Sequence, residues 1–219
     1  MTLHRANIAP VEPSEMLGDL HPLLDQLGSL EGLLTLGAVS AALRLPPVDD
    51  RSSLELFLQA YQSNLLLPVE LPAIEQAYTH TTRHEIRELI ALDRQFGDEA
   101  RRTPFDQASR RIGRSQLARL RPLRDQRAVQ RYLNAVDAGE AHGWHTLVYG
   151  LTLAIYSLPL RQGLLNYGRQ TLRGFIRAAA PALQISEEET FDLLDRISAP
   201  LPATVERLLN PSPAAAQIH

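Results

Sequence analysis

Two pairs of histidines have the type and spacing that could bind a metal ion. His142 and His145 stand three residues apart and His80 and His84 four apart, so each pair could share one face of a helix. Each pair supplies only two ligands, no His-Glu-x-x-His motif is present, and seven histidines produce such spacings readily by chance. We predict no metal site of the chain's own. Capping or core hydrogen bonding is the default role of these side chains, and His142 and His145 are the candidate ligands if a metal contacts the chain.

The composition excludes several kinds of chemistry. The 219 residues include no cysteine, which rules out disulfides, cysteine zinc sites and thiol catalysis. All 22 basic residues are arginine, so the chain lacks the lysine of a P-loop and cannot form a Schiff base. The sequence has no Gly-x-Ser-x-Gly elbow, and its carboxylates fall in patterns typical of a surface. We therefore predict a protein that is not an enzyme and binds no cofactor itself.

Arginines are the remaining residues that could recognise a partner, and they are unevenly distributed. Residues 1–100 hold 6 Arg and 15 acidic residues, whereas residues 101–219 hold 16 Arg and 10 acidic residues. Such polarity suits steering toward charged partners. The net charge of −3 does not predict a nucleic-acid binder, because neutralising phosphates requires a dense positive face. The predicted partner interface comprises Arg110, Arg111, Arg114, Arg161, Arg169, Arg173 and Arg177.

The same arginines are also compatible with two roles that involve no partner. Solvated surface helices produce the same charge asymmetry. The row formed by Arg169, Arg173 and Arg177, which repeats every four residues, could instead pair within the chain. Its partners would then come from the acidic helix that follows, Glu187 to Asp195, with a bridge to Glu187, Glu188 or Asp192 as the specific expectation.

The elements that must position these side chains are helices. Apolar residues recur at helical spacing almost everywhere, strand alternation is almost absent, and prolines at short intervals mark the boundaries. The sequence predicts an all-α protein whose single compact bundle of roughly eight to ten helices spans residues 14–209. Residues 1–13 and the Pro/Ala-rich tail 210–219 are expected to be flexible.

Several helix ends are predicted from local signals. In a capping box a Ser or Thr side chain accepts from a backbone N–H while a Glu three residues later reaches back. We expect such boxes at Ser52 with Glu55, Thr82 with Glu85, and Ser186 with Glu189. Thr103 before Pro104 predicts a further start, and Gly97 predicts a stop.

The longest apolar segment, Leu147 to Leu160, is about one third short of the roughly 20 residues that cross a bilayer. It predicts a central helix, buried over Leu147–Tyr156. Gly168 and Gly174 in the amphipathic helix that follows indicate close helix packing. The proline-broken, polar start of the chain lacks the apolar core of a signal peptide, so we expect no signal peptide and a cytoplasmic protein without a membrane segment.

From about Leu45 to Leu194 the chain resembles the UreF family of urease accessory proteins. The resemblance lies in "SLELFLQAYQSNLLLPVELPAIEQAY", in "ASRRIGRSQL" (108–117), similar to the family's Ser-Arg-x-x-Gly helix, and in "HGWHTLVYGLTLAIYSLPLRQGLLNYGRQTLRGFIRAA". The chain departs from the family near both ends. The expected Phe-Ser pair is missing from "LGSLEGLLTLGAVSAALRL", and of the C-terminal Pro-Leu-Gly-Gln pattern at most Gln184 remains.

The resemblance implies an all-helical dimer that works in a complex with a UreD- or UreH-type protein and the GTPase UreG. That complex delivers nickel to apo-urease, and UreG hydrolyses the GTP. The chain would then be a scaffold and regulator, with nickel and GTP handled by the complex. The alternative is a divergent helical ligand-binding or regulatory protein that shares the family core without a role in urease maturation.

Overall fold

The structure is a computed structural model that describes residues 30–98 and 106–210. These ranges contain helices and no strand, which confirms the all-α prediction. The predicted flexible segments, apart from Asn210, and the predicted start at Thr103 lie outside the described residues. The elements are α3 (Leu30–Ala42), α4 (Arg51–Tyr61), the π-helical segment η1 (Gln62–Glu70), α5 (Leu71–Thr82), α6 (Ile86–Asp98), α7 (Asp106–Arg119), α8 (Arg127–Asp137), α9 (His145–Ile155), α10 (Leu160–Leu183), α11 (Glu187–Ser198) and α12 (Leu201–Leu209).

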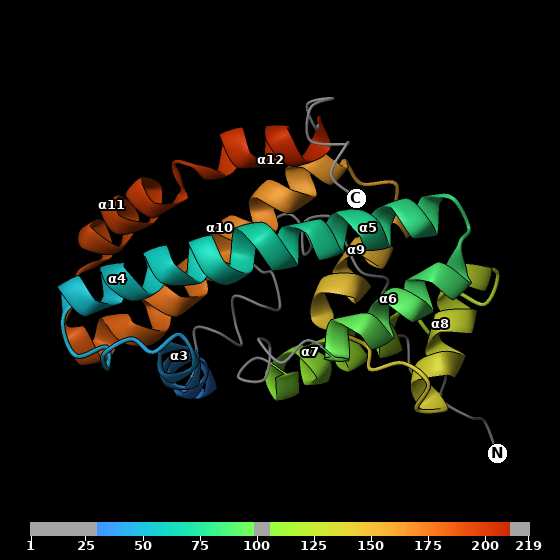
Figure 1. The fold of residues 1–219 in the computed structure, drawn as a ribbon, viewed down its shortest axis with the longest axis horizontal. Coiled ribbons are helices and arrows are strands. Elements are labelled where there is room, and N and C mark those ends of the chain that lie inside the picture. Colours follow the sequence, from blue (N-terminus) through green and yellow to red (C-terminus); the bar gives the residue numbers. More distant parts are fainter. Residues whose placement is uncertain (1–29, 99–105, 211–219) are drawn as a thin grey trace, which may run out of the picture.

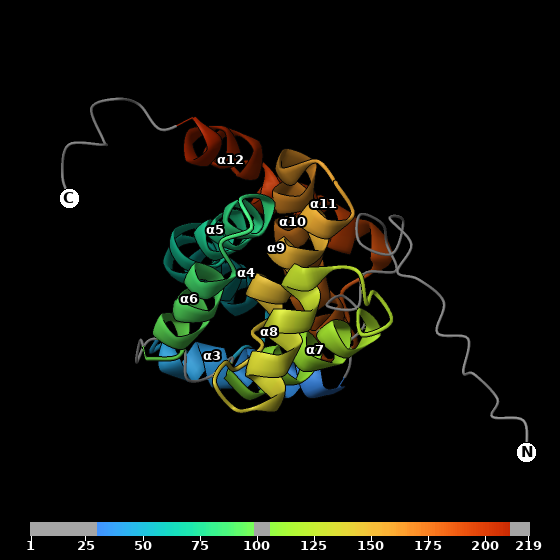
Figure 2. The same ribbon diagram turned by 90° about the vertical axis from the view of Figure 1, so that its right-hand side faces the viewer.

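One long helical arch crosses the molecule. α4, η1 and α5 follow one another without a break and form the cyan-to-green arch of Figure 1. α10 packs against α4 and α5, and α11 and α12 pack in turn on α10. α6, α7 and α8 lie together on the side that faces the viewer in Figure 2; α8 packs against α6 and α7, and α7 packs against α9. None of the described helices is both long and apolar enough to span a membrane.

The prediction of a buried central helix is confirmed. α9 is buried on all sides from His145 to Leu153, and its last residues up to Tyr156 are half-buried. Gly150 allows α9 to cross α5 at backbone contact, since a Cβ added there would lie 2.5 Å from the carbonyl oxygen of Ile74. Close packing is also confirmed at Gly168, where an added Cβ would lie 3.2 Å from the side-chain carbons of Leu201.

Two prolines do not mark the helix boundaries that the sequence predicts. Pro68 lies inside η1 and Pro181 lies inside α10, whereas Pro72 lies in the first turn of α5, at its boundary with η1. Proline lacks an N–H and crowds the carbonyl four residues earlier. The π-helical widening of η1 accommodates Pro68, so that the chain continues as a helix where a break is predicted. Pro159, by contrast, is the N-cap residue of α10, as a boundary proline should be.

The predicted capping box of α11 is confirmed. Ser186 Oγ accepts from the N–H of Glu189 at 3.2 Å, and the Glu189 carboxylate accepts from the N–H of Ser186 at 2.9 Å. These bonds to Ser186 hold the pKa of the Glu189 carboxyl below its usual 4.5. Three glutamates in the first turn also complement the positive end of the helix dipole.

The other two predicted boxes are wrong. α4 begins one residue before Ser52, so Asp50 is the N-cap residue and its side chain accepts from the N–H of Ser53 at 2.7 Å. Glu55 instead pairs with arginines of α4 and α11. Thr82 is the last residue of α5, and no helix starts there; its hydroxyl donates to the carbonyl of Tyr78. α6 is described up to Asp98, one residue past the stop predicted at Gly97.

Replacing Ser186 with alanine is expected to lower the free energy of unfolding by about 1 kcal/mol, the usual contribution of an N-cap side chain. Denaturant unfolding followed by circular dichroism would measure this loss.

Folding lowers the pKa of the Glu189 carboxyl. Its contribution to stability is therefore present above the pKa of the unfolded chain and is lost as pH falls through the lowered pKa of the folded state. A Glu189→Gln variant should therefore lose less stability than wild type below pH 4.5; an identical pH profile would contradict this.

Candidate functional site

The N-terminus of α9 is the point where three other helices converge. Its N-cap residue, Trp144, supplies no side-chain cap. The backbone N–H groups at this end are bonded from other helices instead. Ser109 Oγ of α7 accepts from the N–H of His145 at 3.2 Å, and the Asp93 carboxyl of α6 accepts from those of His142 and Gly143. We call this arrangement of Asp93, Ser109 and residues 142–145 the α9 junction.

Asp93 is the centre of the α9 junction. Its side chain is fully buried, and besides the two backbone N–H groups it accepts from the hydroxyl of Tyr132 on α8. The carbonyl of Asp93 accepts from the indole N–H of Trp144 at 3.0 Å. Burial, and then the nearby Asp93 charge, raise the pKa of the Tyr132 hydroxyl well above its usual value. One residue of α6 thus fixes α8 and the start of α9.

α7 approaches the same junction at backbone distance. A Cβ added to Gly113 would lie 2.0 Å from the carbonyl oxygen of Gly143, so only glycine fits there. The guanidinium of Arg110 lies 5.1 Å from the centre of the Trp144 ring, and Arg114 Nε donates to the carbonyl of His142 at 3.0 Å. The segment 108–117 therefore holds α7 against α9 through a hydroxyl, a glycine and two arginines.

The structure does not bring the two candidate metal ligands to a common centre with further ligands. His145 is buried and stacks on Tyr167, with ring centres 5.9 Å apart, whereas the half-buried His142 lies edge-on to Trp144 at 5.6 Å. His80 pairs with Glu85 at 2.9 Å. The described residues contain no group of three or more His, Cys, Asp or Glu side chains placed to hold a metal ion. His142 and His145 thus pack against aromatic rings, and His80 pairs locally.

The expectation that carboxylates lie only in surface patterns is wrong at two positions. Asp93 is one of them, and Glu70 is the other, with 8% of its surface exposed. Glu70 accepts from the hydroxyls of Tyr61 at 2.8 Å and Tyr167 at 3.1 Å, which joins the arch to α10. Burial raises the pKa of both tyrosines well above the usual value. Asp93 could have been noticed, because it continues the apolar spacing of Ile86 and Leu89 in α6.

The predicted interface arginines divide between two helices. Arg110, Arg111 and Arg114 lie on α7, and Arg161, Arg169, Arg173 and Arg177 lie on α10. Arg161 pairs with Glu206 of α12. Arg169 pairs with Asp195 of α11 at 2.6 Å and donates to Ser198 at 3.3 Å. Arg169 therefore pairs within the chain with the predicted acidic helix. Its acceptor is Asp195, the last residue of the expected range 187–195, and not Glu187, Glu188 or Asp192. Arg177 is exposed and Arg173 half-buried.

Comparison with protein families gives one match that covers most of the chain. The family model described as UreF matches residues 48–197, which include the arch, the α9 junction and α10. A comparison with curated proteins found no match. The motifs at residues 108–117 and 142–180 lie within the matched range, and the described residues have the all-helical architecture that the resemblance implies. The chain belongs to the UreF family and is therefore a member of a family of urease accessory proteins.

Proposed function

We propose that this chain is a scaffold and regulator in the assembly of the nickel centre of urease. It would act in a complex with a UreD- or UreH-type protein and the GTPase UreG, and that complex would deliver nickel to apo-urease. The family match over residues 48–197 is the observation that carries this proposal. The α9 junction supports it, since the segment that resembles the family's Ser-Arg-x-x-Gly helix supplies the contacts that fix α7 on α9.

The composition supports a division of labour within that complex. The chain has no lysine for a P-loop and no cysteine for a thiolate site, so GTP and nickel are assigned to its partners. The protein would contribute binding surfaces, as a homodimer in the cytoplasm. In this scheme it controls when UreG hydrolyses GTP and does not hydrolyse it itself.

We propose the two arginine groups as the partner surfaces. Arginine suits such surfaces because its planar fork pairs with carboxylates through two bonds and is weakly hydrated. On α7, Arg111 and Arg114 are exposed beside the rigid α9 junction. On α10, Arg177 is exposed two turns beyond the internally paired Arg169, with Arg173 between them. Arg111 and Arg177 have exposed side chains and can be changed without touching the packed core.

The test is co-purification of the tagged chain with the UreD- or UreH-type protein and UreG. Wild type is expected to recover both partners. Reversing charge in Arg111→Glu with Arg114→Glu, or in Arg173→Glu with Arg177→Glu, is expected to lower recovery about tenfold or more in at least one variant, because like charges then meet across the interface. Arg207→Glu, an exposed position on α12, is the matched control.

The outcomes separate two claims. Failure of the wild-type chain to capture either partner would reject the proposed function. Full recovery by both double variants, with unchanged melting temperatures, would reject only the arginine surfaces. Melting temperatures matter because Arg114 also holds the carbonyl of His142, so its reversal could act through the fold.

A further inference from the structure

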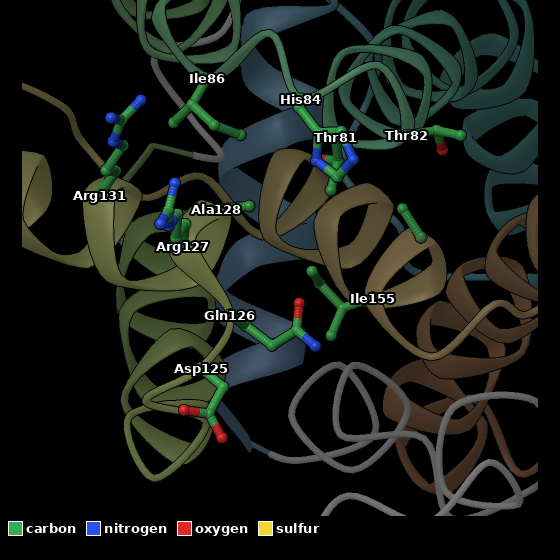
Figure 3. A pocket seen from close by; sticks show the side chains of 11 residues that line it. Thr81, Thr82, His84, Ile86, Asp125, Gln126, Arg127, Ala128, Arg131 and Ile155 are labelled. Atoms are coloured by element: carbon green, nitrogen blue, oxygen red, sulfur yellow. The ribbon is translucent and has the colours of Figure 1, made fainter.

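A cavity lies where α5, α8 and α9 meet, away from the α9 junction. It has a volume of about 570 Å³ and is walled by the turn between α5 and α6, the N-terminus of α8 and the C-terminal end of α9. Figure 3 shows Arg127 and Gln126 on one side, with His84 and Ile155 across from them. Pockets that bind small molecules commonly measure about 300–1,000 Å³. The cavity is therefore large enough for a small ligand.

Its charged wall is mainly cationic. Arg127 and Arg131 lie four residues apart on α8, so both side chains reach the same face of the helix. Neither has an ion-pair partner among the described residues. Asp125 is the only acidic residue among those that line the cavity. Two guanidinium groups that share a concave wall can bind an oxyanion through parallel charge-assisted hydrogen bonds.

The end of α8 strengthens this preference for anions. α8 begins at Arg127, and its N-cap residue, Gln126, makes no side-chain capping bond. The free N–H groups of a first helical turn and the helix dipole both favour negative charge nearby. These N–H groups and the dipole add to the attraction that Arg127 and Arg131 exert on an anion; without the two arginines they would not make a binding site.

The opposite wall is held in a defined shape. His84 has a left-handed backbone conformation with φ of 60°, which is uncommon outside glycine. The turn that carries it is fixed by the pair between His80 and Glu85 and by the backbone bond from Glu85 to His80. His84 brings a ring N–H donor to the cavity, and Ile86 and Ile155 bring apolar surface.

We propose that this cavity binds a small organic anion, one with a phosphate or carboxylate group for Arg127 and Arg131 and an apolar part. The anionic group would lie against α8, and the apolar part against Ile86 and Ile155. A second cavity of about 410 Å³ between α6 and α8 shares Ile86 and Arg131 with the first, and its lining adds Arg87 and one acidic residue, Glu140. This inference goes beyond the proposed function and does not depend on it.

The test is isothermal titration of the full chain at constant ionic strength, with pyrophosphate, citrate, phosphate and phenyl phosphate as probes. Comparing pyrophosphate with citrate distinguishes a phosphate from a carboxylate group. Saturable binding by at least one of the two is expected. Phenyl phosphate should bind more tightly than inorganic phosphate, because only its ring can contact Ile86 and Ile155.

Variants assign the binding to the cavity. Arg127→Gln and Arg131→Gln are each expected to weaken it about tenfold, the size of a lost charge-assisted hydrogen bond. Asp125→Asn should tighten it, because a like charge is removed. Arg124→Gln is the matched control, since Arg124 is exposed just before α8 but does not line the cavity. All three arginines are exposed, so melting temperatures should not change.

Two results would overturn the proposal. An equal loss of affinity in Arg124→Gln and in Arg127→Gln would show that the anions are attracted to a basic surface in general and not to the cavity. If none of the four probes shows saturable binding, the cavity binds no small anion of this class.

Discussion

Replacing Asp93 with alanine is expected to lower the free energy of unfolding by about 3 kcal/mol or more, because it leaves buried donors without an acceptor. The three donors are the Tyr132 hydroxyl and the N–H groups of His142 and Gly143. They come from α8 and from the start of α9, so one substitution loosens both elements from α6. Asp93→Asn keeps the shape of the side chain but replaces one acceptor oxygen with a donor NH₂ group. We expect it to lower the free energy of unfolding less, by about 2 kcal/mol.

The protein provides its own probe for this measurement. Trp144 is the single tryptophan, and its indole N–H donates to the carbonyl of Asp93. Denaturant unfolding can therefore be followed by fluorescence at the junction and by circular dichroism over the whole chain. Glu88→Ala is the matched control, since Glu88 is an exposed acidic residue on the same helix, and its loss should stay within about 0.5 kcal/mol. Equal stabilities of Asp93→Ala and Glu88→Ala would contradict the role assigned to Asp93.

Helix positions that depend on local pattern could be predicted from the sequence. The burial of α9 follows from its unbroken apolar composition, and the start of α11 follows from Ser186 with Glu189, three residues away. The box at Ser52 failed because Asp50 competes for the same role two residues earlier and is an equally good N-cap residue. Local signals identify the helix, and small differences between neighbouring polar residues decide its first residue.

Proline failed as a boundary signal in the arch because the surrounding packing overrides it. Leu66 and Leu71 on either side of Pro68 are fully buried, so a continuous helix keeps both in the core. A π-helical turn removes the clash that a regular α-helix would impose at Pro68. The stabilisation comes from burying Leu66 and Leu71 in the tertiary structure, so no local sequence rule predicts it.

The α9 junction could be predicted only in part. The spacing of Ile86, Leu89 and Asp93 places the Asp93 side chain on the buried face of α6, so its burial was predictable. Its partners were not, because Tyr132 and Gly143 lie 39 and 50 residues further along the chain. The same holds for Glu70, whose partner Tyr167 is 97 residues away. Buried polar groups must be bonded, but the pattern of one helix does not say by which residue.

Replacing Gly113 with alanine is expected to be the most harmful single-methyl change in the described part of α7. The added Cβ would lie 2.0 Å from the carbonyl oxygen of Gly143 and 2.7 Å from the N of His145, and both are backbone atoms. No rotamer change can relieve such an overlap, so α7 must move away from α9. We expect a loss of about 3 kcal/mol or more, at or above the upper end of the range for overpacking.

Gly37→Ala is the matched control for this prediction. Gly37 is an exposed residue of α3 with nothing within 4 Å of an added Cβ, so alanine there should raise the free energy of unfolding by about 1 kcal/mol through helix propensity. Opposite signs from the same chemical change would show that the close approach of α7 to α9 causes the loss. A Gly113→Ala protein as stable as wild type would mean that α7 does not lie against Gly143. Since Ser109, Arg110 and Arg114 reach the α9 junction from α7, Gly113→Ala should also weaken capture of the partners at temperatures where the variant remains folded.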